Sequence, residues 1–380
     1  MATDAPIPLS VLDLAPITEG SDAATAVRRS IELAQHAERL GYRRFWLAEH
    51  HAVAVASSST AVLIALIADA TTEIRVGSAA VQSGVHTPLS IVEAFGTIDA
   101  LHPGRLDLGL GRSAQRRAEH RARADDRAQA PAQPDAEDLI VDGLLIPPPF
   151  PIGELLTSPR VAAAVDATRF EGAVPPDFTD AVDDVLALLA GRFRHGEVAL
   201  TAVPGSGADT PVWIFGSSKG QSAQVAGARG LPFVANYHVS PSTVLEAVEA
   251  YRSAFVPSPG LAEPYVVVSA DVVVASDDAT ARHRALTYGH WVYGIRSGAG
   301  AQPYLDPDTA PPLWADAAPL VEDRVRTQFV GAPDTVADGL RTLARVTGAD
   351  ELVVTSITHD FAQRVQSHRL LARAWGLVPR

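Results

Sequence analysis

The sequence contains no cysteine, one methionine and one lysine, Lys219, in 380 residues. Without thiols the chain can form no disulfide, no iron–sulfur cluster, no cysteine-ligated zinc site and no thiolate nucleophile. Any chemistry must therefore come from histidine, carboxylate, arginine or hydroxyl side chains, or from a bound cofactor.

Positive charge is also scarce. Lysine and arginine together number 31 against 44 aspartate and glutamate residues, a formal net charge of −13. Such a surface repels phosphate backbones and anionic lipid, so we expect no nucleic-acid partner and no membrane partner. No apolar run is long enough to cross a bilayer, and Met1–Asp13 lacks a basic segment followed by an apolar stretch. These absences predict a cytoplasmic protein.

Hydrophobic residues, in contrast, make up 47% of the chain, enough for a large core. Short β-rich runs alternate with longer amphipathic stretches, a pattern typical of βα units around a parallel sheet. The eight candidate strands are Leu9–Leu14, Arg44–Ala48, Ile74–Val81, Leu106–Leu110, Val212–Phe215, Pro232–Ala235, Val266–Val274 and Glu351–Ser356. They predict an α/β protein with one closed (β/α)8 TIM barrel domain over residues 1–380. An open doubly wound sheet is the alternative, but Ala15–Gly20 lacks a glycine-rich dinucleotide turn.

Two irregular regions interrupt this alternation. Residues 116–175, after the fourth strand, contain proline clusters, and we interpret them as an insertion. Residues 298–320, between the seventh and eighth strands, are rich in proline, alanine and aspartate. On a barrel both regions overhang the C-terminal face, where active sites of this fold lie, so they are candidate lids. Within the insertion only short apolar runs such as Leu139–Val141 and Leu144–Ile146 could pack onto the barrel, whereas a helix is expected over 177–189.

Glu49, His50 and His51 follow the second predicted strand, where a buried strand opens into a loop. A neutral imidazole can take or donate a proton near neutral pH, so these residues are candidate catalytic groups, with His50 or His51 as the base or as a donor to a developing oxyanion. The alternative is that they cap the strand and bond backbone groups. Two adjacent histidines are weak evidence for a metal site, which needs more ligands at suitable spacing, and we predict no metal.

Ser78, Ala79 and Ala80 lie at the end of the third predicted strand. Their small side chains leave room for a flat ligand against the backbone, although ordinary close packing is the alternative. His86 follows in the next loop, where we expect it to make loop hydrogen bonds.

Gly111 and Arg112 follow the fourth predicted strand. The glycine permits a sharp turn, and the planar, permanently charged guanidinium of Arg112 would project over the barrel mouth, where a phosphate is a natural partner. A salt bridge from Arg112 to Asp107 or Glu93 is the alternative.

Gly216–Ser222 is a glycine- and serine-rich loop that runs into a helix after the fifth predicted strand. Backbone N–H groups at the start of that helix would form an anion cradle together with Lys219 and three hydroxyl groups, those of Ser217, Ser218 and Ser222. Helix capping without a ligand, and a lysine that points into solvent, are the alternatives.

Six segments together resemble the luciferase-like flavin monooxygenase family, which includes bacterial luciferase. In chain order they are Glu49–His51, Ser78–Val81, His102–Arg112, Gly216–Ser218, Arg229–Pro232 and Thr355–Asp360. The resemblance covers residues 8–115 and 177–375 and leaves the insertion outside. It implies a (β/α)8 barrel that binds reduced FMN and oxygen at its C-terminal face.

Residue by residue, the resemblance implies that His50 is the catalytic imidazole and that the Ala79–Ala80 peptide bond is cis beneath the isoalloxazine ring. It implies a flavin-phosphate contact for Arg112 and a second phosphate-contacting segment with the serines Ser217, Ser218 and Ser222. Gly111 departs from bacterial luciferase, which has a cysteine there beside the reactive flavin carbon. This departure argues against light emission from a long-chain aldehyde.

The function implied by the resemblance is oxygenation of a small organic substrate by reduced FMN (FMNH2) and O2 through a peroxyflavin intermediate. A separate flavin reductase would supply FMNH2, because the chain has no nicotinamide-binding turn. The closest alternative is an F420-dependent oxidoreductase of the same superfamily, whose anionic cofactor tail would suit the insertion residues Arg116, Arg117, Arg121 and Arg123. A non-catalytic flavin-binding barrel is a further alternative. Related barrels often dimerise, so a homodimer is expected.

Overall fold

Eight parallel strands close into a barrel in the computed structural model, which describes residues 7–112, 137–150 and 158–380. The barrel strands are β1 (Leu9–Asp13), β2 (Arg44–Leu47), β3 (Arg75–Ser78), β5 (Leu106–Gly111), β10 (Val212–Gly216), β11 (Phe233–Asn236), β12 (Val266–Val274) and β14 (Glu351–Thr355). The order is β10, β11, β12, β14, β1, β2, β3, β5, and the pairing of β5 with β10 closes the ring. The predicted (β/α)8 barrel is confirmed, and each of its strands overlaps a predicted strand.

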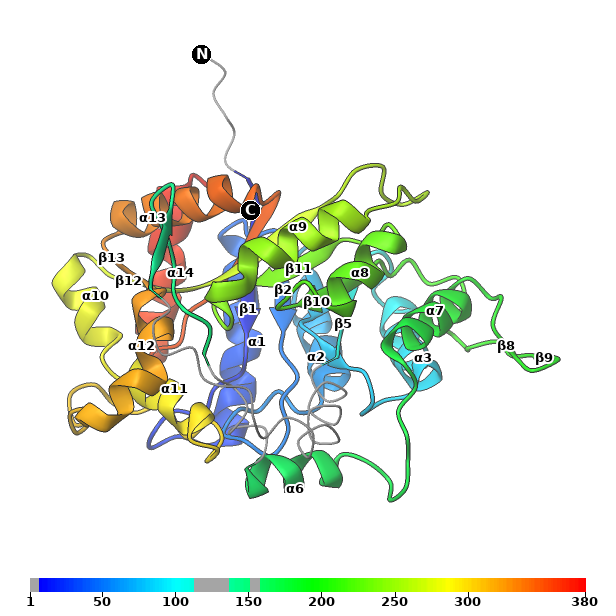
Figure 1. Cartoon of the computed structure of the whole chain (residues 1–380), viewed down its shortest axis with the longest axis horizontal. Coiled ribbons are helices and arrows are strands. Elements are labelled where there is room, and N and C mark those ends of the chain that lie inside the picture. The colour runs from blue at the N-terminus through cyan, green and yellow to red at the C-terminus, as the bar shows by residue number, and fades with distance from the viewer. Residues whose placement is uncertain (1–6, 113–136, 151–157) are drawn as a thin grey trace, which may run out of the picture.

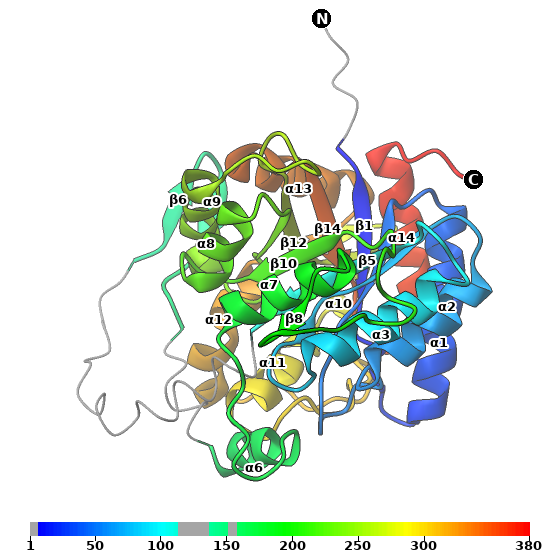
Figure 2. The same ribbon diagram turned by 90° about the vertical axis from the view of Figure 1, so that its right-hand side faces the viewer.

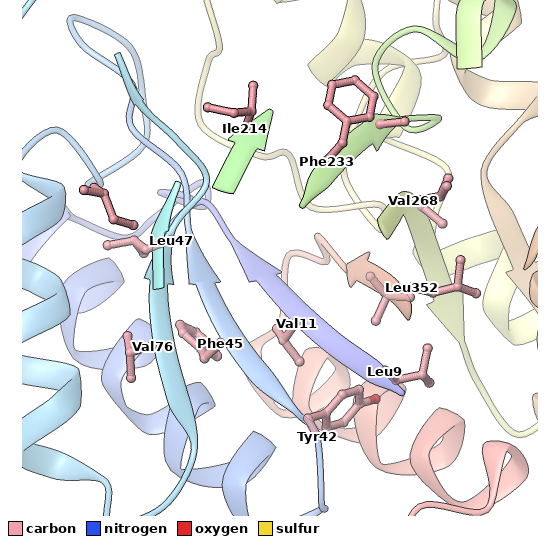
Figure 3. Packing of buried hydrophobic residues seen from close by; sticks show 14 of the residues in the cluster. Leu9, Val11, Tyr42, Phe45, Leu47, Val76, Ile214, Phe233, Val268 and Leu352 are labelled. Atoms are coloured by element: carbon pink, nitrogen blue, oxygen red, sulfur yellow. The ribbon is translucent and has the colours of Figure 1, made fainter. Parts of the chain in front are cut away.

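Alternation along these strands produces two apolar layers. Val11, Phe45 and Val76 belong to a large cluster that also contains helix residues such as Leu33 and Ile64, so their side chains face the surrounding helices (Figure 3). The alternate strand positions form a second cluster inside the barrel, with Leu12, Trp46, Trp213, Val234, Val267 and Val353. The barrel interior is therefore a packed core below the site.

Eight helices of the outer ring surround the strands (Figures 1 and 2). They are α1 (Ala23–Arg39), α2 (Thr60–Ala70), α3 (Pro88–Asp99), α7 (Phe178–Leu189), α8 (Gln221–Ala228), α9 (Val244–Ala254), α13 (Pro333–Thr347) and α14 (Phe361–Trp375), with the short 3₁₀ helix η1 (Pro241–Thr243) before α9. The helix expected over 177–189 is α7, and Asp177 caps it by accepting a hydrogen bond of 2.8 Å from the Thr179 N–H. No helix in the described part of the chain combines the length and the apolar character needed to span a membrane.

The third predicted strand is interrupted. β3 ends at Ser78, the Ala79–Ala80 peptide bond is cis, and a short strand β4 (Val81–Gln82) then pairs with β5. The prediction of one continuous strand over Ile74–Val81 is therefore wrong at its end. The cis bond at Ala79–Ala80 is the one that the family resemblance implies.

The chain between β12 and β14 is more regular than expected. It contains α10 (Asp278–Arg284), α11 (Tyr288–Arg296), the 3₁₀ helix η2 (Ala315–Ala317), α12 (Ala318–Arg326) and a short strand β13 (Phe329–Gly331) that pairs with β12. The expected irregular region 298–320 thus includes η2 and the start of α12. Two of its residues, Ala301 and Tyr304, are buried in one cluster with Trp291, so this part packs on the barrel.

The insertion contributes a hairpin and a helix. Strands β6 (Leu139–Val141) and β7 (Leu144–Ile146) form an antiparallel hairpin, and β7 lies against α13. Leu144 and Ile146 are buried in the main core, whereas Leu139 and Ile140 are 56% and 61% exposed. Of the two apolar runs expected to pack, the second does, whereas the first packs only through the partly buried Val141. A further hairpin, β8 (Arg194–His195) and β9 (Val198–Ala199), follows α7 and is exposed.

Helix α6 (Pro159–Ala167) lies at the C-terminal ends of the barrel strands, away from the last residue of the chain (Figures 1 and 2). Ser158 caps it through a hydrogen bond of 3.2 Å from the Val161 N–H. The arginine run 116–123, which motivated the F420 alternative, lies outside the described residues.

A group that we call the charged floor closes the other, N-terminal end of the barrel interior. It consists of Arg44, Asp107 and Glu351, and all three are buried. Arg44 donates to Asp107 at 3.1 Å and to Glu351, while the Trp213 indole N–H donates to Asp107 at 3.0 Å. Asp107 is therefore bound to Arg44 and Trp213 at the N-terminal end of the barrel. The alternative of a salt bridge between Arg112 and Asp107 is wrong, because Arg112 lies at the opposite end of the strands.

Candidate active site

A cavity of about 420 Å³ opens at the C-terminal ends of the barrel strands. It is lined by most residues singled out from the sequence: Glu49, His50, His51, Ala79, Ala80, Gly111, Arg112, Gly216, Ser217, Ser218 and Ser222. These residues follow β2, β3, β5 and β10, so barrel closure brings four separate loops to one site. The volume is within the range of cofactor and ligand pockets.

A carboxylate holds two histidines at the cavity edge, and we call Glu49, His51 and His86 the Glu49 cluster. One oxygen, Glu49 Oε1, accepts hydrogen bonds from His51 Nε2 at 2.9 Å and His86 Nε2 at 3.2 Å. Burial raises the pKa of Glu49, but the two hydrogen bonds outweigh it and leave the pKa below its usual value. The hydrogen bond between His86 and Glu49 also raises the pKa of His86. The expectation that His86 makes loop hydrogen bonds is confirmed.

Ala79, Ala80 and Gly111 form a platform of small residues beside the Glu49 cluster. A Cβ added at Gly111 would lie 3.2 Å from Ala80 Cβ, so a larger residue would crowd this platform. Ser78 does not belong to it, although we expected it to contact the cofactor. Its Oγ donates to the Gly109 carbonyl at 2.9 Å and accepts from the Gly109 N–H at 3.0 Å, so Ser78 joins β3 to β5 outside the cavity.

Arg112, Ser217, Ser218 and Ser222 line another part of the cavity, and we call them the anion-binding end because the sequence predicts an anion there. A Cβ at Gly216 would meet the Phe233 ring at 2.7 Å, so only glycine fits this approach. Lys219 is not part of this end. Its side chain is 72% exposed, its Nζ lies 3.3 Å from Glu246 Oε2, and it is not among the residues that line the cavity.

The deepest side of the cavity carries polar residues that sequence reasoning missed, and we call them the polar wall: His238, Ser269, Asp271, Tyr288 and Arg324. The Tyr288 hydroxyl donates to the Asp271 carboxylate and accepts from Arg324 Nη2 at 2.8 Å. Arg324 Nη2 also lies 3.5 Å from Asp271 Oδ2. Burial raises the pKa of Asp271 despite Arg324 and Tyr288.

His238 is the imidazole of the polar wall, and its Nδ1 is hydrogen-bonded to Ser269 Oγ. Burial, with smaller contributions from the positive charges of Arg324 and His50, lowers the pKa of His238 to about 3. The ring is therefore neutral at physiological pH and can both donate and accept a hydrogen bond.

Only part of the polar wall had a sequence signal. Ser269 and Asp271 stand two residues apart in the valine-rich run Val266–Val274, and this spacing puts both side chains on one face of a strand. Tyr288 and Arg324 come from α11 and α12, and no short-range pattern connects them with β12.

A model of the luciferase-like monooxygenase family matches residues 7–138 and 176–351 of this chain. The chain belongs to this family. A luciferase-like monooxygenase of Escherichia coli K12 is 33% identical over 370 residues, which cover 97% of each protein. The structure of apo-MsnO8 has 31% sequence identity and a TM-score of 0.75, and the match covers 98% of this chain and 100% of that one.

Proteins of this fold use more than one redox cofactor. The oxygenating constituent of 3,6-diketocamphane monooxygenase from Pseudomonas putida, in complex with FMN, matches with 17% identity, a TM-score of 0.62 and coverage of 97% and 98%. An F420-dependent secondary alcohol dehydrogenase matches with 12% identity, a TM-score of 0.59 and coverage of 97% and 99%. The fold alone therefore does not select between FMN and F420.

Proposed function

We propose that this protein is an FMN-dependent monooxygenase that uses reduced FMN and O2 to oxygenate a small organic substrate. The observation that carries the proposal is the junction of two surfaces in one cavity. The platform of Ala79, Ala80 and Gly111 suits a flat ring, and the anion-binding end with Arg112 suits a phosphate.

The residues present fit FMN. Arg112 provides a fixed positive charge, and three serine hydroxyls stand near the start of α8, where backbone N–H groups are free of helix hydrogen bonds. We assign the phosphate to Arg112 and to the serines Ser217, Ser218 and Ser222. Bound in its reduced form, FMN supplies the electrons that activate molecular oxygen.

The protein's own groups then control protons and water. His50 lines the cavity and is the group to which we assign proton transfer, with Glu49 orienting His51 beside it. Apolar side chains cover much of the remaining lining and exclude water, among them Leu14, Val55, Trp291, Ile295 and Ile357.

Helix α6 is the proposed cover of the site. Val161 and Ala164 line the cavity, and Arg160 Nη2 donates to the Ala52 carbonyl at 2.8 Å across the mouth. We propose that the insertion is part of a single barrel domain and closes on the bound flavin. Hydrogen exchange with and without FMN tests this: slower exchange in α6 on binding is expected, and unchanged exchange would contradict the cover.

We propose a cytoplasmic homodimer that receives reduced flavin from a separate reductase. The segment Ala15–Gly20 after the first strand lacks a glycine-rich nicotinamide turn. Sedimentation equilibrium tests the dimer. Turnover with photoreduced FMN and no reductase would show that the partner only delivers reduced flavin.

The decisive experiment compares cofactors and follows oxygen. Purified protein is titrated anaerobically with reduced FMN and with reduced F420, then mixed with 18O2 and a panel of small sulfur, carbonyl and alkene compounds. The proposal expects FMN binding and an 18O-labelled product detected by mass spectrometry. Binding of F420 alone would favour hydride transfer, and peroxide release without any product would favour a non-catalytic flavin barrel.

The catalytic assignment has its own test. His50→Ala should keep FMN binding but lower labelled product or divert oxygen to free peroxide. If coupled turnover is unchanged in His50→Ala, the role does not belong to His50, and His51→Ala becomes the variant to measure.

A further inference from the structure

We propose that the Glu49 cluster is a binding site for one divalent transition-metal ion, with zinc as the defining probe. Glu49, His51 and His86 each offer one ligand atom, and these three atoms lie within 4.8 Å of one another. No sequence motif joins them, because His86 is in a different loop. The proposal does not depend on which flavin or substrate the cavity takes.

The spacing of the ligand atoms suits a metal. Glu49 Oε1 lies 2.9 Å from His51 Nε2 and 3.2 Å from His86 Nε2. Tetrahedral zinc with bonds of about 2.0–2.2 Å holds its ligand atoms about 3.4 Å apart. Each of the two pairs that include Glu49 Oε1 therefore needs to open by only a few tenths of an ångström to accept the ion, a shift that the side-chain torsions of the two histidines can provide.

The electrostatic setting also favours a cation. Glu49 is buried, and its ion-pair partners within the described residues are the two histidines and no arginine or lysine. An imidazole, unlike a guanidinium, is not a permanent charge, so these partners give the buried carboxylate no permanent counter-charge. A divalent ion would provide one.

Hydrogen bonds to backbone carbonyls hold the two histidine loops in place without an ion. Gln82 Nε2 donates to the Glu49 carbonyl at 2.9 Å, which ties the loop after β2 to the segment that leads to His86. The Val85 N–H donates to the Gln82 carbonyl at 3.1 Å and closes the turn before His86. The ligands are thus preorganised, which reduces the entropy lost on binding.

Access and chemistry define the ion. The side chains of His51 and His86 are 23% and 41% exposed, so an ion can enter from solvent. Two imidazoles and one carboxylate suit zinc, iron, nickel or copper, whereas magnesium and calcium prefer oxygen ligands. Because Glu49 and His51 line the cavity, the ion would lie at its edge with coordination positions left for water or a substrate oxygen.

Isothermal titration of the full-length protein, first dialysed against a chelator, tests the site. Zinc should bind one equivalent per chain with micromolar affinity or better, and magnesium at the same concentration should give no saturable heat. His86→Gln and Glu49→Gln should each weaken zinc binding at least tenfold. The matched control is His195→Gln, which alters an exposed histidine on the β8–β9 hairpin and should leave the affinity unchanged.

The control matters because the chain has 12 histidines, and others such as His283 and His359 lie within 4.0 Å of aspartates. Unchanged zinc affinity in His86→Gln would overturn the proposal, because the ion would then belong to another site. Absence of saturable zinc binding by the wild-type protein would overturn it as well. Zinc K-edge absorption of the loaded protein should show two imidazole nitrogens, and a signal without imidazole would count against the site. FMN affinity and melting temperature, measured on each variant, show whether His86→Gln is folded independently of the metal result.

Discussion

The two ends of the barrel interior both bury carboxylates, but they pair them with different cations. At the charged floor, Asp107 and Glu351 hold Arg44, whose charge is permanent, in a sealed layer. At the mouth, Glu49 holds two histidines, His51 and His86, whose charge is not permanent, and Glu49 and His51 line an open cavity. The floor can only contribute to folding, whereas the mouth can exchange protons and accept ligands. The comparison shows that the type of cationic partner and the access of solvent decide whether a buried carboxylate only stabilises the fold or can also take part in function.

The largest effect is expected at the floor. Glu351→Ala leaves Arg44 with one carboxylate in a buried layer and removes the acceptor of the Tyr265 hydroxyl, which donates to Glu351 at 3.0 Å. Breaking a buried ion pair from one side should lower the free energy of unfolding by about 3–5 kcal/mol. Urea denaturation measures this loss. FMN affinity measured on the folded variant should match that of the wild type, and a selective loss of FMN binding would contradict the separation of the two ends.

At the mouth, the largest effect is expected for flavin binding. Arg112→Ala should weaken FMN binding roughly tenfold or more, since a charge-assisted contact contributes about 1.5–3 kcal/mol. Fluorescence titration with FMN measures the affinity. Lys219→Ala is the control, because this lysine pairs with Glu246 outside the cavity and its loss should not change FMN affinity. Equal losses in the two variants would contradict the assigned phosphate position.

We expect the polar wall to stabilise the fold, as the charged floor does, although it lines the cavity. Tyr288→Phe removes the hydroxyl that joins Asp271 to Arg324, and the loss of a buried hydrogen-bonding group should cost about 1–3 kcal/mol of unfolding free energy. The control is Tyr293→Phe on the same helix, whose hydroxyl makes no hydrogen bond within the described residues. Thermal and urea unfolding compare the two variants. A similar loss of unfolding free energy in the two variants would mean that the hydrogen bonds among Asp271, Tyr288 and Arg324 contribute nothing beyond packing.

The smallest effect concerns pH. The folded-state pKa of His86 is raised above 6.5, so its contribution to stability is complete below pH 6.5 and is lost as pH rises through the folded pKa. The pKa of Glu49 is lowered below 4.5, so its contribution is present above pH 4.5 and is lost as pH falls through the folded pKa. The Glu49 cluster should therefore stabilise the fold most between these two values.

Histidine NMR in metal-free buffer measures this comparison directly. His86 should titrate above its ordinary pKa and return toward it in Glu49→Gln. His238, with a pKa of about 3, should not titrate between pH 5 and pH 8. Titration of His238 in that range would show that the polar wall is wetter than the structure indicates.

The sequence by itself predicted the set of barrel strands and part of the cavity lining. A continuous valine-rich run marks a buried strand such as Val266–Val274, and residues directly after a barrel strand have little freedom to leave its mouth. This is why Glu49, His50, His51 and Arg112 were found without coordinates. Ser78 and Lys219 do not line the cavity, because proximity along the chain does not determine which way a side chain points.

Tertiary structure decided the contacts made across the barrel. His86 meets Glu49, and Tyr288 meets Asp271, only when closure of the ring and packing of α11 set the distances between segments that are remote or differently oriented in sequence. The insertion shows the same division, since Leu139–Val141 and Leu144–Ile146 are equally apolar, but Leu139 and Ile140 are exposed while Leu144 and Ile146 are buried in the core. The local pattern depends on hydrogen bonding and burial along one segment, so the sequence determined the barrel strands and the residues that follow them. A site depends on where several segments meet, so tertiary packing determined which side chains come together at the cavity.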